Sequence, residues 1–540
     1  MRPRNLPGLR SFPSIPISIC NGVALLLVFA AGNGPAAAQL ASVGLSSVGA
    51  QIFGSEDLLF YGPEAGEQFG LAVVAGDFNG DGIDDLATGL PLDSGFVNDP
   101  IPGTGAVVIR YGLPGRRLEP GLADTYLTQL ASGSPDPAEP NELFGWSLAA
   151  GDFNGDGIDD LAVGIPQNKT GAPTAGGVEI FYGRAGEIEL VGAEFLRQGV
   201  AGIPGTPANN DQFGNGLAAG DFDADGFDDL AVGSPFEEVQ GFTDAGTVTV
   251  FHGAATGLLP FRGYLVSRAE PGVEGNVASA NYFGEVLAAG DFDNDGADDL
   301  AIGVQFENGS TGSVQRIYGG ASGLNFSRSP IVVGAASGDH FGAALAAGDF
   351  DADGTDDLAI GAPMVGFTVS GQPRFSVGRV TVLYFSTAES FDQGMLFGAA
   401  AQQEGDRFGS ALAAGDFDGD GRDDLAIGQP GEDLGATGSE RGGVTILTGD
   451  SPGGLAHYFR FLSPGFSGIP GTAQVGQQVG MTLTAGDFDD NGCADLVLGT
   501  PFRTVEGIGI AAGGEIVLYG ALFADGFELG SSFSWSAAVL

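Results

Sequence analysis

Short apolar runs alternate with turns rich in Gly, Asp and Pro along most of the 540-residue chain, and the same pattern returns seven times. Each unit holds, in order, a small-residue run such as LAAG, a run such as DLAIG, an alternating run such as VEIFYG (178–183) and a looser run such as YLVSRA (264–269). Such runs, rich in β-branched and aromatic residues and bounded by turn residues, are typical of strands. Each unit therefore predicts four short strands rather than helices.

Two short motifs keep a fixed place in every unit. An aspartate-rich motif begins at Asp77, Asp152, Asp221, Asp291, Asp349, Asp416 and Asp487, at intervals of 58 to 75 residues. A Phe-Gly pair precedes each of the first six motifs, and Val479-Gly480 takes its place in the seventh. Four-stranded antiparallel units repeated about four to eight times are typical of a β-propeller, whereas the coils of a β-solenoid are far shorter. The sequence therefore predicts an all-β fold, a seven-bladed β-propeller of four-stranded antiparallel blades.

The ends of the repeat predict how the ring closes. The seventh unit stops after its third strand, at Gly520, and a strand-like run at 57–61 (DLLFY) stands unpaired before the first unit. In a ring, an N-terminal strand would complete the last blade and remove the exposed sheet edge of an open array. We therefore expect closure by an N-terminal strand, with 57–61 as the candidate.

The first 38 residues have the features of a signal peptide. Arg2, Arg4 and Arg10 precede an apolar stretch at 23–31 (VALLLVFAA), and 36–38 (AAA) is a small-residue cleavage site. The apolar stretch is short for a membrane span, although a short membrane anchor is the alternative. We expect a signal peptide at 1–38, an N-terminal segment at 39–54, the propeller at 55–520 and a C-terminal tail at 521–540. The mature chain is then expected to be secreted, extracellular or on the cell surface, with the periplasm as an alternative, and to have no transmembrane segment.

Charge and cysteine content exclude several classes of function. The chain has 68 Asp and Glu against 20 Lys and Arg, a net charge of −48. A surface this acidic repels nucleic acids and anionic membranes, so neither is an expected partner. The two cysteines, Cys20 and Cys493, exclude a disulfide framework and a cysteine-based zinc cluster. We expect a monomer.

The aspartate-rich motif has the spacing of a cation-binding loop. Positions 1, 3, 5 and 9 are Asp or Asn in every copy, and position 6 is Gly, which permits a turn that directs the carbonyl of position 7 inward. The seven loops hold 32 of the 68 acidic residues, and such clusters would repel one another without cations. All-oxygen donors with several carboxylates favour Ca²⁺ over zinc or copper, and over magnesium, which prefers to keep its water. The alternative is that these motifs are ordinary Asp/Asn-Gly hairpin turns, whose polar side chains face solvent and bind no metal.

Each loop keeps four side-chain ligands and one carbonyl, so the sequence predicts up to seven Ca²⁺. The candidate ligands are Asp77, Asn79, Asp81, Ile83 and Asp85; Asp152, Asn154, Asp156, Ile158 and Asp160; Asp221, Asp223, Asp225, Phe227 and Asp229; Asp291, Asp293, Asp295, Ala297 and Asp299; Asp349, Asp351, Asp353, Thr355 and Asp357; Asp416, Asp418, Asp420, Arg422 and Asp424; and Asp487, Asp489, Asn491, Cys493 and Asp495. The Asp at position 8, which Ala494 replaces in the seventh copy, is expected to lie outside the metal's ligand set.

The sequence offers no catalytic motif. His252, His340 and His457 lie in different units, and His252 replaces a tyrosine of the third strand, which suggests a packing position. The chain has no HExxH and no phosphate-cradling loop. We therefore expect no enzymatic activity. The alternative is a carbohydrate-binding lectin or a polysaccharide-active enzyme, because paired carboxylates are abundant.

The Phe-Gly, DxDxDG and Gly-x-Pro pattern resembles the FG-GAP repeats of the integrin α-subunit head, in a bacterial secreted form. The resemblance covers about 55–520, with departures at Gly303-Val304-Gln305 and at Val479. It implies a seven-bladed propeller, metal in some of the loops, and a non-enzymatic role in binding or adhesion. Because function resides in sites rather than folds, the resemblance supports the fold more strongly than the biology.

The topology also predicts where a partner binds. Connections of antiparallel strands alternate between the two faces of the ring, so the second-to-third and fourth-to-first connections lie opposite the metal hairpins. These longer connections differ between units, and such loops on a rigid scaffold often bind partners. We expect an unknown protein or glycan ligand there. The candidate anchors are Phe96, Phe236, Phe242, Phe306, Phe367, Arg374 and Phe502.

Overall fold

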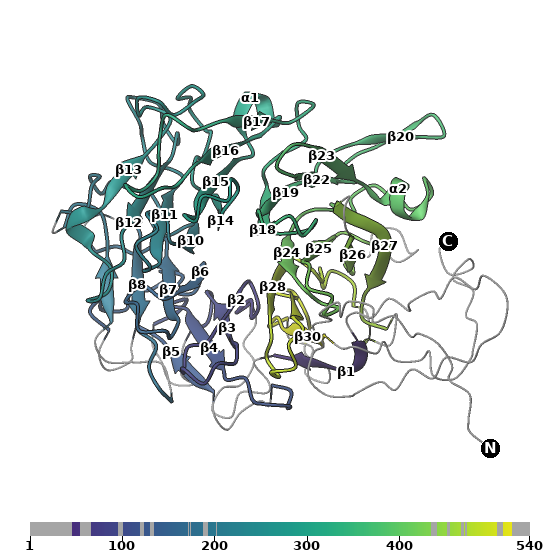
Figure 1. Ribbon diagram of the computed structural model, residues 1–540, viewed down its shortest axis with the longest axis horizontal. Helices are drawn as coiled ribbons and strands as arrows, with labels where there is room; N and C mark the ends of the chain where they lie inside the picture. Colours follow the sequence, from purple (N-terminus) through teal and green to yellow (C-terminus); the bar gives the residue numbers. More distant parts are fainter. Residues whose placement is uncertain are drawn as a thin grey trace, which may run out of the picture.

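Seven four-stranded antiparallel sheets stand around a central opening in the computed structural model (Figure 1). The structure describes residues 46–54, 66–94, 101–118, 124–129, 134–170, 172, 174–186, 193–200, 202–433, 440–450, 454–465, 469, 472, 474–504 and 511–520. This arrangement confirms the predicted all-β, seven-bladed propeller. Among these residues, no helix combines the length and the hydropathy that a membrane crossing requires.

The strands follow the predicted order within each blade, from the innermost outward. Blade one is β2 (Ala72–Gly76), β3 (Asp85–Leu90), β4 (Ala106–Arg110) and β5 (Thr125–Leu127), and blade two is β6 (Leu148–Gly151), β7 (Asp160–Ile165), β8 (Gly177–Phe181) and β9 (Glu194–Leu196). Blade three is β10 (Leu217–Gly220), β11 (Asp229–Ser234), β12 (Thr247–Phe251) and β13 (Tyr264–Val266), and blade four is β14 (Val286–Gly290), β15 (Asp299–Val304), β16 (Ser313–Ile317) and β17 (Ile331–Val333). Blade five is β18 (Ala344–Gly348), β19 (Asp357–Ala362), β22 (Arg379–Leu383) and β23 (Ala388–Phe391), and blade six is β24 (Leu412–Gly415), β25 (Asp424–Gly428), β26 (Val444–Asp450) and β27 (Gly454–Leu462).

Blade seven takes its outer strand from the N-terminal part of the chain. It consists of β28 (Thr482–Gly486), β29 (Asp495–Gly499), β30 (Glu515–Tyr519) and β1 (Ser46–Phe53), and β1 pairs antiparallel with β30. Closure by an N-terminal strand is thus confirmed, but the strand is Ser46–Phe53 rather than 57–61, which lies outside the described residues. The propeller sheet therefore begins within the segment that the sequence pattern set apart as 39–54.

The remaining elements are short and lie in the connections. A hairpin, β20 (Phe367–Val369) and β21 (Gln372–Arg374), stands between the second and third strands of blade five. Two α-helical turns, α1 (Glu307–Ser310) and α2 (Gln393–Phe397), and a 3-10 turn, η2 (Pro260–Arg262), complete the described elements.

The strand sequences match their places in the sheet. The second and third strands are buried on both faces, as β3, β4, β7 and β8 show. These strands therefore read as almost continuous apolar runs. The innermost strands are half exposed and built of small residues, as in LAAG of β6 and β10. Small side chains suit the crowded axis where seven strands converge.

The Phe-Gly pair joins each blade to the one before it. Phe144 of blade two is fully buried in a cluster with Val107 and Ile109 of β4 and Leu161 of β7. Its N–H donates to Thr104 O at 3.0 Å, and Gly105, with φ +85°, lies so close that an added Cβ would be 2.1 Å from Phe144 O. Only glycine fits this approach. The Phe-Gly motif therefore recurs because it makes the contact between neighbouring blades.

Candidate metal centres and the opposite face

Each aspartate-rich motif forms the hairpin between the first and second strands of its blade. In blade one, β2 ends at Gly76, position 1 is Asp77, and position 9, Asp85, begins β3. The short loop between them brings the odd-numbered positions together. The carboxylates at positions 1, 3 and 5 lie within 4.8 Å of one another in blades three, four and five, as do those at positions 1, 3 and 9 in blade six.

The Asp at position 1 holds the loop in shape. In blade one, Asp77 Oδ1 accepts from the N–H groups of Gly80 at 2.7 Å and Asp81 at 3.1 Å, and its Oδ2 accepts from Gly82 N–H at 2.7 Å. The carboxylates of Asp152, Asp221, Asp291, Asp349, Asp416 and Asp487 accept equivalent bonds. The loop backbone is therefore wound around a negative charge.

The carboxyl group at position 9 is the most deeply buried. Asp85 accepts from Phe78 N–H at 3.1 Å and from Gly112 N–H at 2.8 Å, and it is 0 % exposed. Burial raises the pKa of Asp85 and of Asp160 to about 8, and the charges of the loop carboxylates add to the effect. Burial likewise raises the pKa of Asp299 to about 7 and that of Asp424 to about 9. These sites therefore favour a bound positive charge, a proton or a metal ion.

Several carboxylate oxygens in the loops have no hydrogen-bond partner. Oδ1 is buried without a partner in Asp223, Asp293 and Asp489, all at position 3. The same holds for Asp357 at position 9 of blade five, where Phe385 replaces the glycine whose N–H donates in the other blades. An unpaired buried oxygen is costly, and a hard cation with oxygen ligands would satisfy it. The residues present therefore fit a calcium ion.

The Asp at position 8 links neighbouring blades, a role that the sequence did not reveal. Asp159 Oδ2 accepts from Asp77 N–H at 2.9 Å, and Asp159 N–H donates to Asp77 O at 3.0 Å. Asp228, Asp298, Asp356, Asp423 and Asp84 accept the same bond from the preceding blade. At the seam between blades six and seven, Ala494 N–H still donates to Asp416 O at 2.9 Å, but the residue has no carboxylate.

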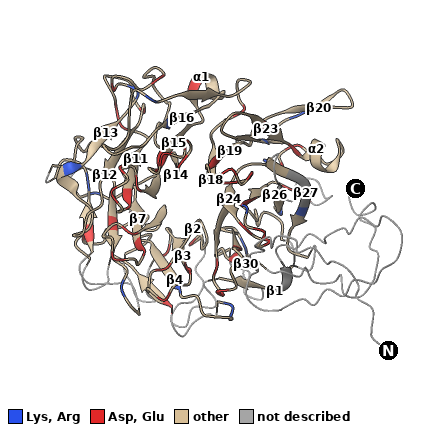
Figure 2. Cartoon of the chain, in the orientation of Figure 1, with Lys and Arg blue, Asp and Glu red and all other residues tan. Residues whose placement is uncertain are grey.

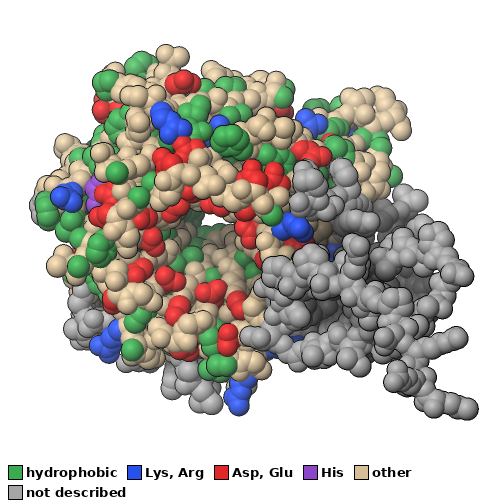
Figure 3. Space-filling view, viewed as in Figure 1, with side chains coloured by type: hydrophobic (Ala, Val, Ile, Leu, Met, Phe, Trp, Pro, Cys, Tyr) green, Lys and Arg blue, Asp and Glu red, His purple; other side chains and the backbone are tan. Residues whose placement is uncertain are grey.

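Figure 2 shows acidic residues recurring around the inner part of the ring, and Figure 3 shows acidic side chains around the central opening.

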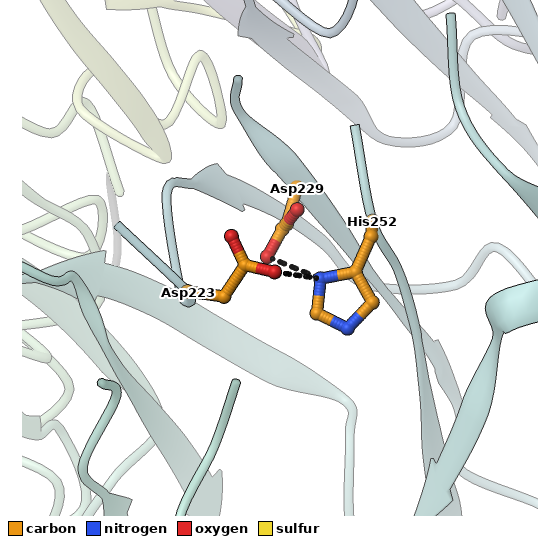
Figure 4. Close-up of side chains that lie close together, drawn as sticks. All are labelled: Asp223, Asp229 and His252. Atoms are coloured by element: carbon orange, nitrogen blue, oxygen red, sulfur yellow. Dashed lines mark hydrogen bonds and ion pairs between the residues drawn. The ribbon is translucent and has the colours of Figure 1, made fainter. Parts of the chain in front are cut away.

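Among the described residues, basic side chains contact candidate ligands in three of the hairpins. In blade six, Arg422 Nη1 lies 2.7 Å from Asp420 Oδ2. His252 Nδ1 lies 3.1 Å from Oδ2 of both Asp223 and Asp229 in blade three (Figure 4). The hydrogen bond with Asp229 raises the pKa of His252. In blade four, Arg328 Nη2 lies 2.5 Å from Asp293 Oδ2. The expectation that His252 only packs is therefore incomplete, because its imidazole faces the candidate ligands.

A stripe of aromatic rings crosses the face opposite the hairpins. Phe236, Tyr282, Phe306 and His340 stack edge to face, with successive ring centroids 5.0, 5.1 and 5.1 Å apart. Phe236 and Phe306 follow the second strands of blades three and four, and Tyr282 and His340 precede the first strands of blades four and five. All four rings are partly exposed. We call these four residues the aromatic stripe.

The candidate anchors divide into exposed and packed side chains. Phe236 and Phe306 belong to the aromatic stripe, and Phe242 and Phe502 are 42 % and 37 % exposed. Phe367 instead packs beneath Arg379, whose guanidinium carbon lies 5.0 Å from the ring centroid. Arg374 is partly buried in β21, and Phe96 lies outside the described residues. Further exposed apolar side chains in connections on this face are Leu92, Trp146, Met364, Phe375, Met395 and Val475.

The fold and the hairpins define a class, a seven-bladed propeller with an aspartate loop in each blade. The FG-GAP repeat family matches this chain at 69–109, 144–180, 213–251, 283–315, 341–383 and 408–447. Each match begins at the Phe of a Phe-Gly pair and ends within a third strand. The chain is therefore an FG-GAP repeat propeller. The six matches fall in blades one to six, and blade seven carries the Val479 departure.

The chain is also similar to known proteins over this region. It is 37 % identical to "Integrin alpha-5" of Xenopus laevis over 227 residues, 41 % of this chain and 20 % of that protein. It is 32 % identical to "Integrin alpha-PS2" of Drosophila melanogaster over 234 residues, 42 % of this chain and 16 % of that protein. It is 30 % identical to "Phosphatidylinositol-glycan-specific phospholipase D" of Bos taurus over 187 residues, 34 % of this chain and 21 % of that protein.

These similarities are confined to a part of each relative. The matched region spans about a fifth of the length of the curated relatives. Proteins named as integrin α chains and a protein named as a phospholipase thus share a region similar to this propeller. A solved structure of Sqt1 from Chaetomium thermophilum aligns with 87 % of this chain and 100 % of that chain, at a TM-score of 0.41 and 12 % identity.

Proposed function

We propose that this chain is a secreted, calcium-binding propeller that acts as a non-enzymatic binding or adhesion module. The observation that carries the proposal is the difference between its two faces. One face has hairpins with buried, unpartnered carboxylate oxygens, and the other has the aromatic stripe. In this arrangement the calcium ions stabilise the scaffold, and the opposite face binds the partner.

Calcium is proposed in up to seven hairpins, each through positions 1, 3, 5, 7 and 9. An ion that binds only the folded chain stabilises it by about 2.7 kcal/mol when its free concentration is about 100-fold above Kd. We expect a large fall in melting temperature when EDTA replaces millimolar Ca²⁺. Asp81→Ala, which removes one side-chain ligand, should lower the calorimetric stoichiometry by one. A melt that EDTA leaves unchanged would contradict structural calcium.

The partner is proposed to be a protein, bound to the face opposite the hairpins, with a glycan as the second possibility. Aromatic side chains and Arg are enriched among residues that dominate binding energy at protein interfaces. Eukaryotic relatives named as integrin α chains share the repeat. The chain itself is proposed to be monomeric.

A binding experiment with face-specific variants tests this proposal. The purified chain, with and without EDTA, is used to capture material from the organism's own surface and medium. The triple variant Phe236→Ala, Phe306→Ala, Phe502→Ala should lose capture without a change in melting temperature. The matched control is Phe261→Ala, Phe385→Ala, because both side chains are 68 % exposed in third-to-fourth connections on the hairpin face. Loss with the control and none with the triple variant would overturn the assignment of the face.

The alternative class is a lectin or a polysaccharide-active enzyme. Binding on a glycan array without product release would identify a lectin, whereas turnover of a polysaccharide would identify an enzyme. Secretion is tested separately: mass spectrometry of the chain recovered from the medium should find Gln39 as its first residue. An intact N-terminus in that material would contradict the proposed signal peptide.

A further inference from the structure

The third strand of blade three ends in a residue that no other blade has at this place. The equivalent residues are Tyr111, Tyr182, Tyr318, Tyr384 and Tyr519 in blades one, two, four, five and seven, Thr448 in blade six, and His252 in blade three. β12 ends at Phe251, so His252 lies over the hairpin that joins β10 and β11. Blade three therefore has, next to its hairpin, a ring nitrogen that can coordinate a metal ion.

The tyrosines at this place often tie one blade to the next. The hydroxyl oxygens of Tyr182, Tyr384 and Tyr519 accept from the N–H groups of Leu258 at 3.2 Å, Leu455 at 2.9 Å and Leu118 at 2.9 Å, each in the following blade. In blade three the equivalent bond, from Leu324 N–H at 3.2 Å, goes to Tyr264 of β13. Since Tyr264 makes this contact, His252 is available to the hairpin.

The imidazole and two carboxylates converge on one point (Figure 4). His252 Nδ1 is 3.1 Å from Asp223 Oδ2 and 3.1 Å from Asp229 Oδ2. Asp229 is 0 % exposed, and Asp223 Oδ1 is buried without a partner. Two ligands that each lie about 2.0–2.1 Å from one metal are themselves about 3 Å apart. The observed spacing is therefore that of neighbouring ligands of a single ion.

The mixed donor set changes which metal the hairpin prefers. Calcium takes oxygen ligands, whereas an imidazole nitrogen suits zinc, copper and nickel. We propose that the blade-three hairpin binds a divalent transition metal, with Zn²⁺ as the ion to be tested, through His252 Nδ1 and the carboxylates of Asp223 and Asp229. Blade three would then differ from the calcium hairpins of the other blades. The inference rests on the proposed function only in taking the hairpin as a metal site.

Metal analysis of the untagged full chain tests the inference. The chain is dialysed against millimolar Ca²⁺ with micromolar Zn²⁺, and both metals are counted by mass spectrometry. We expect one tightly held zinc per chain. His252→Asn keeps an N–H donor near the position of Nδ1 but removes the metal-binding nitrogen, and it should weaken zinc binding at least about 100-fold, because even second-shell changes cost about 10–100-fold.

Two further variants make the result specific. His340→Asn, in the aromatic stripe on the opposite face, is the matched control and should retain the zinc. Tyr384→His places an imidazole over the hairpin of blade five, where Asp351 and Asp357 occupy positions 3 and 9, and it should add a second zinc. If His252→Asn and the parent chain have the same melting temperature in EDTA, the variant is folded.

The outcomes separate this inference from the proposed calcium binding. Zinc that is lost in His252→Asn supports the inference, whether or not calcium binds elsewhere. No zinc in the parent chain, or equal zinc in the parent and in His252→Asn, overturns it. If calcium still binds in that case, the proposed function stands. If zinc depends on His252 and calcium binds nowhere, the inference stands and the calcium proposal fails.

Discussion

At the residue scale, buried carboxyl groups away from the hairpins couple stability to pH. Glu179 in β8 is 0 % exposed, and burial raises its pKa from 4.5 to about 8, with the charge of Asp136 adding to the effect and a hydrogen bond from Ser134 opposing it. The folded chain thus binds this proton more tightly than the unfolded chain. The stabilisation is complete below about pH 4.5 and is lost as the pH rises through about 8.

Glu179→Gln should remove this part of the pH dependence, because an amide resembles the protonated acid. We expect the variant to melt close to the parent at pH 5 and above the parent at pH 8.5. Gln315 occupies the equivalent place in β16, which indicates that the amide fits. Glu404→Gln, at an exposed position, is the control and should follow the parent at both pH values. A parent and a Glu179→Gln variant with equal melting temperatures at pH 8.5 would refute the assignment.

At the scale of the elements, each blade is joined to the next by the hairpins themselves. At six seams the position-8 carboxylate accepts a hydrogen bond from the backbone N–H of position 1. At five of these seams, as between Asp298 and Asp221, the position-8 N–H also donates to the position-1 carbonyl oxygen. At the seventh seam, Ala494 makes only the backbone half. The seam between blades six and seven is therefore the one that lacks the carboxylate bond.

Substitutions at position 8 should alter stability in opposite directions. Asp298→Ala removes a charged acceptor and should cost about 1–3 kcal/mol of unfolding free energy. Ala494→Asp restores the missing carboxylate and should add about 1 kcal/mol. Urea denaturation in millimolar Ca²⁺ measures both changes, with Asp298→Asn, which retains an acceptor oxygen, as the milder control. A fall in stability with Ala494→Asp would show that the added charge outweighs the bond.

At the scale of the whole molecule, one seam closes the ring through residues far apart in sequence. Arg110 of β4 pairs with Glu515 of β30, both almost fully buried, and Thr88 Oγ1 donates to Glu515 Oε2 at 2.7 Å. The guanidinium carbon of Arg110 lies 4.5 Å from the ring centroid of Phe53, in β1. β1 therefore covers a buried ion pair as well as completing a sheet.

Deletion of the chain through Phe53 should open the ring. The unpaired edge of β30 and the exposed Arg110–Glu515 pair should cause aggregation or a loss of cooperative unfolding. The control deletion stops at residue 45 and retains β1, so it should melt like the parent. If both deletions unfold with the same midpoint and cooperativity, β1 does not close the ring in solution.

Local pattern was sufficient for the fold and for the hairpins. Strand alternation, turn residues and a repeated period depend on short stretches of chain, and seven copies of each reinforced the same interpretation. The placement of positions 1 to 9 between the first and second strands followed in the same way, because a loop of nine residues has few arrangements. The placement of Phe236, Phe306 and Phe502 on the face opposite the hairpins also followed, since strand direction alone assigns each connection to a face.

Contacts between distant segments were decided only by the tertiary structure. The sequence pattern indicated 57–61, whereas pairing with β30 and packing of Phe53 on Arg110 identify β1 as the outer strand of blade seven. Asp159 and Asp77 lie 82 positions apart, so no local sequence pattern indicates that they form a hydrogen bond. His252 faces its hairpin, and Tyr264, from another strand, makes the bond to blade four that third-strand tyrosines make in other blades. Local sequence determined the blades, their number and their loops, and the packing of blade against blade determined what several of their side chains do.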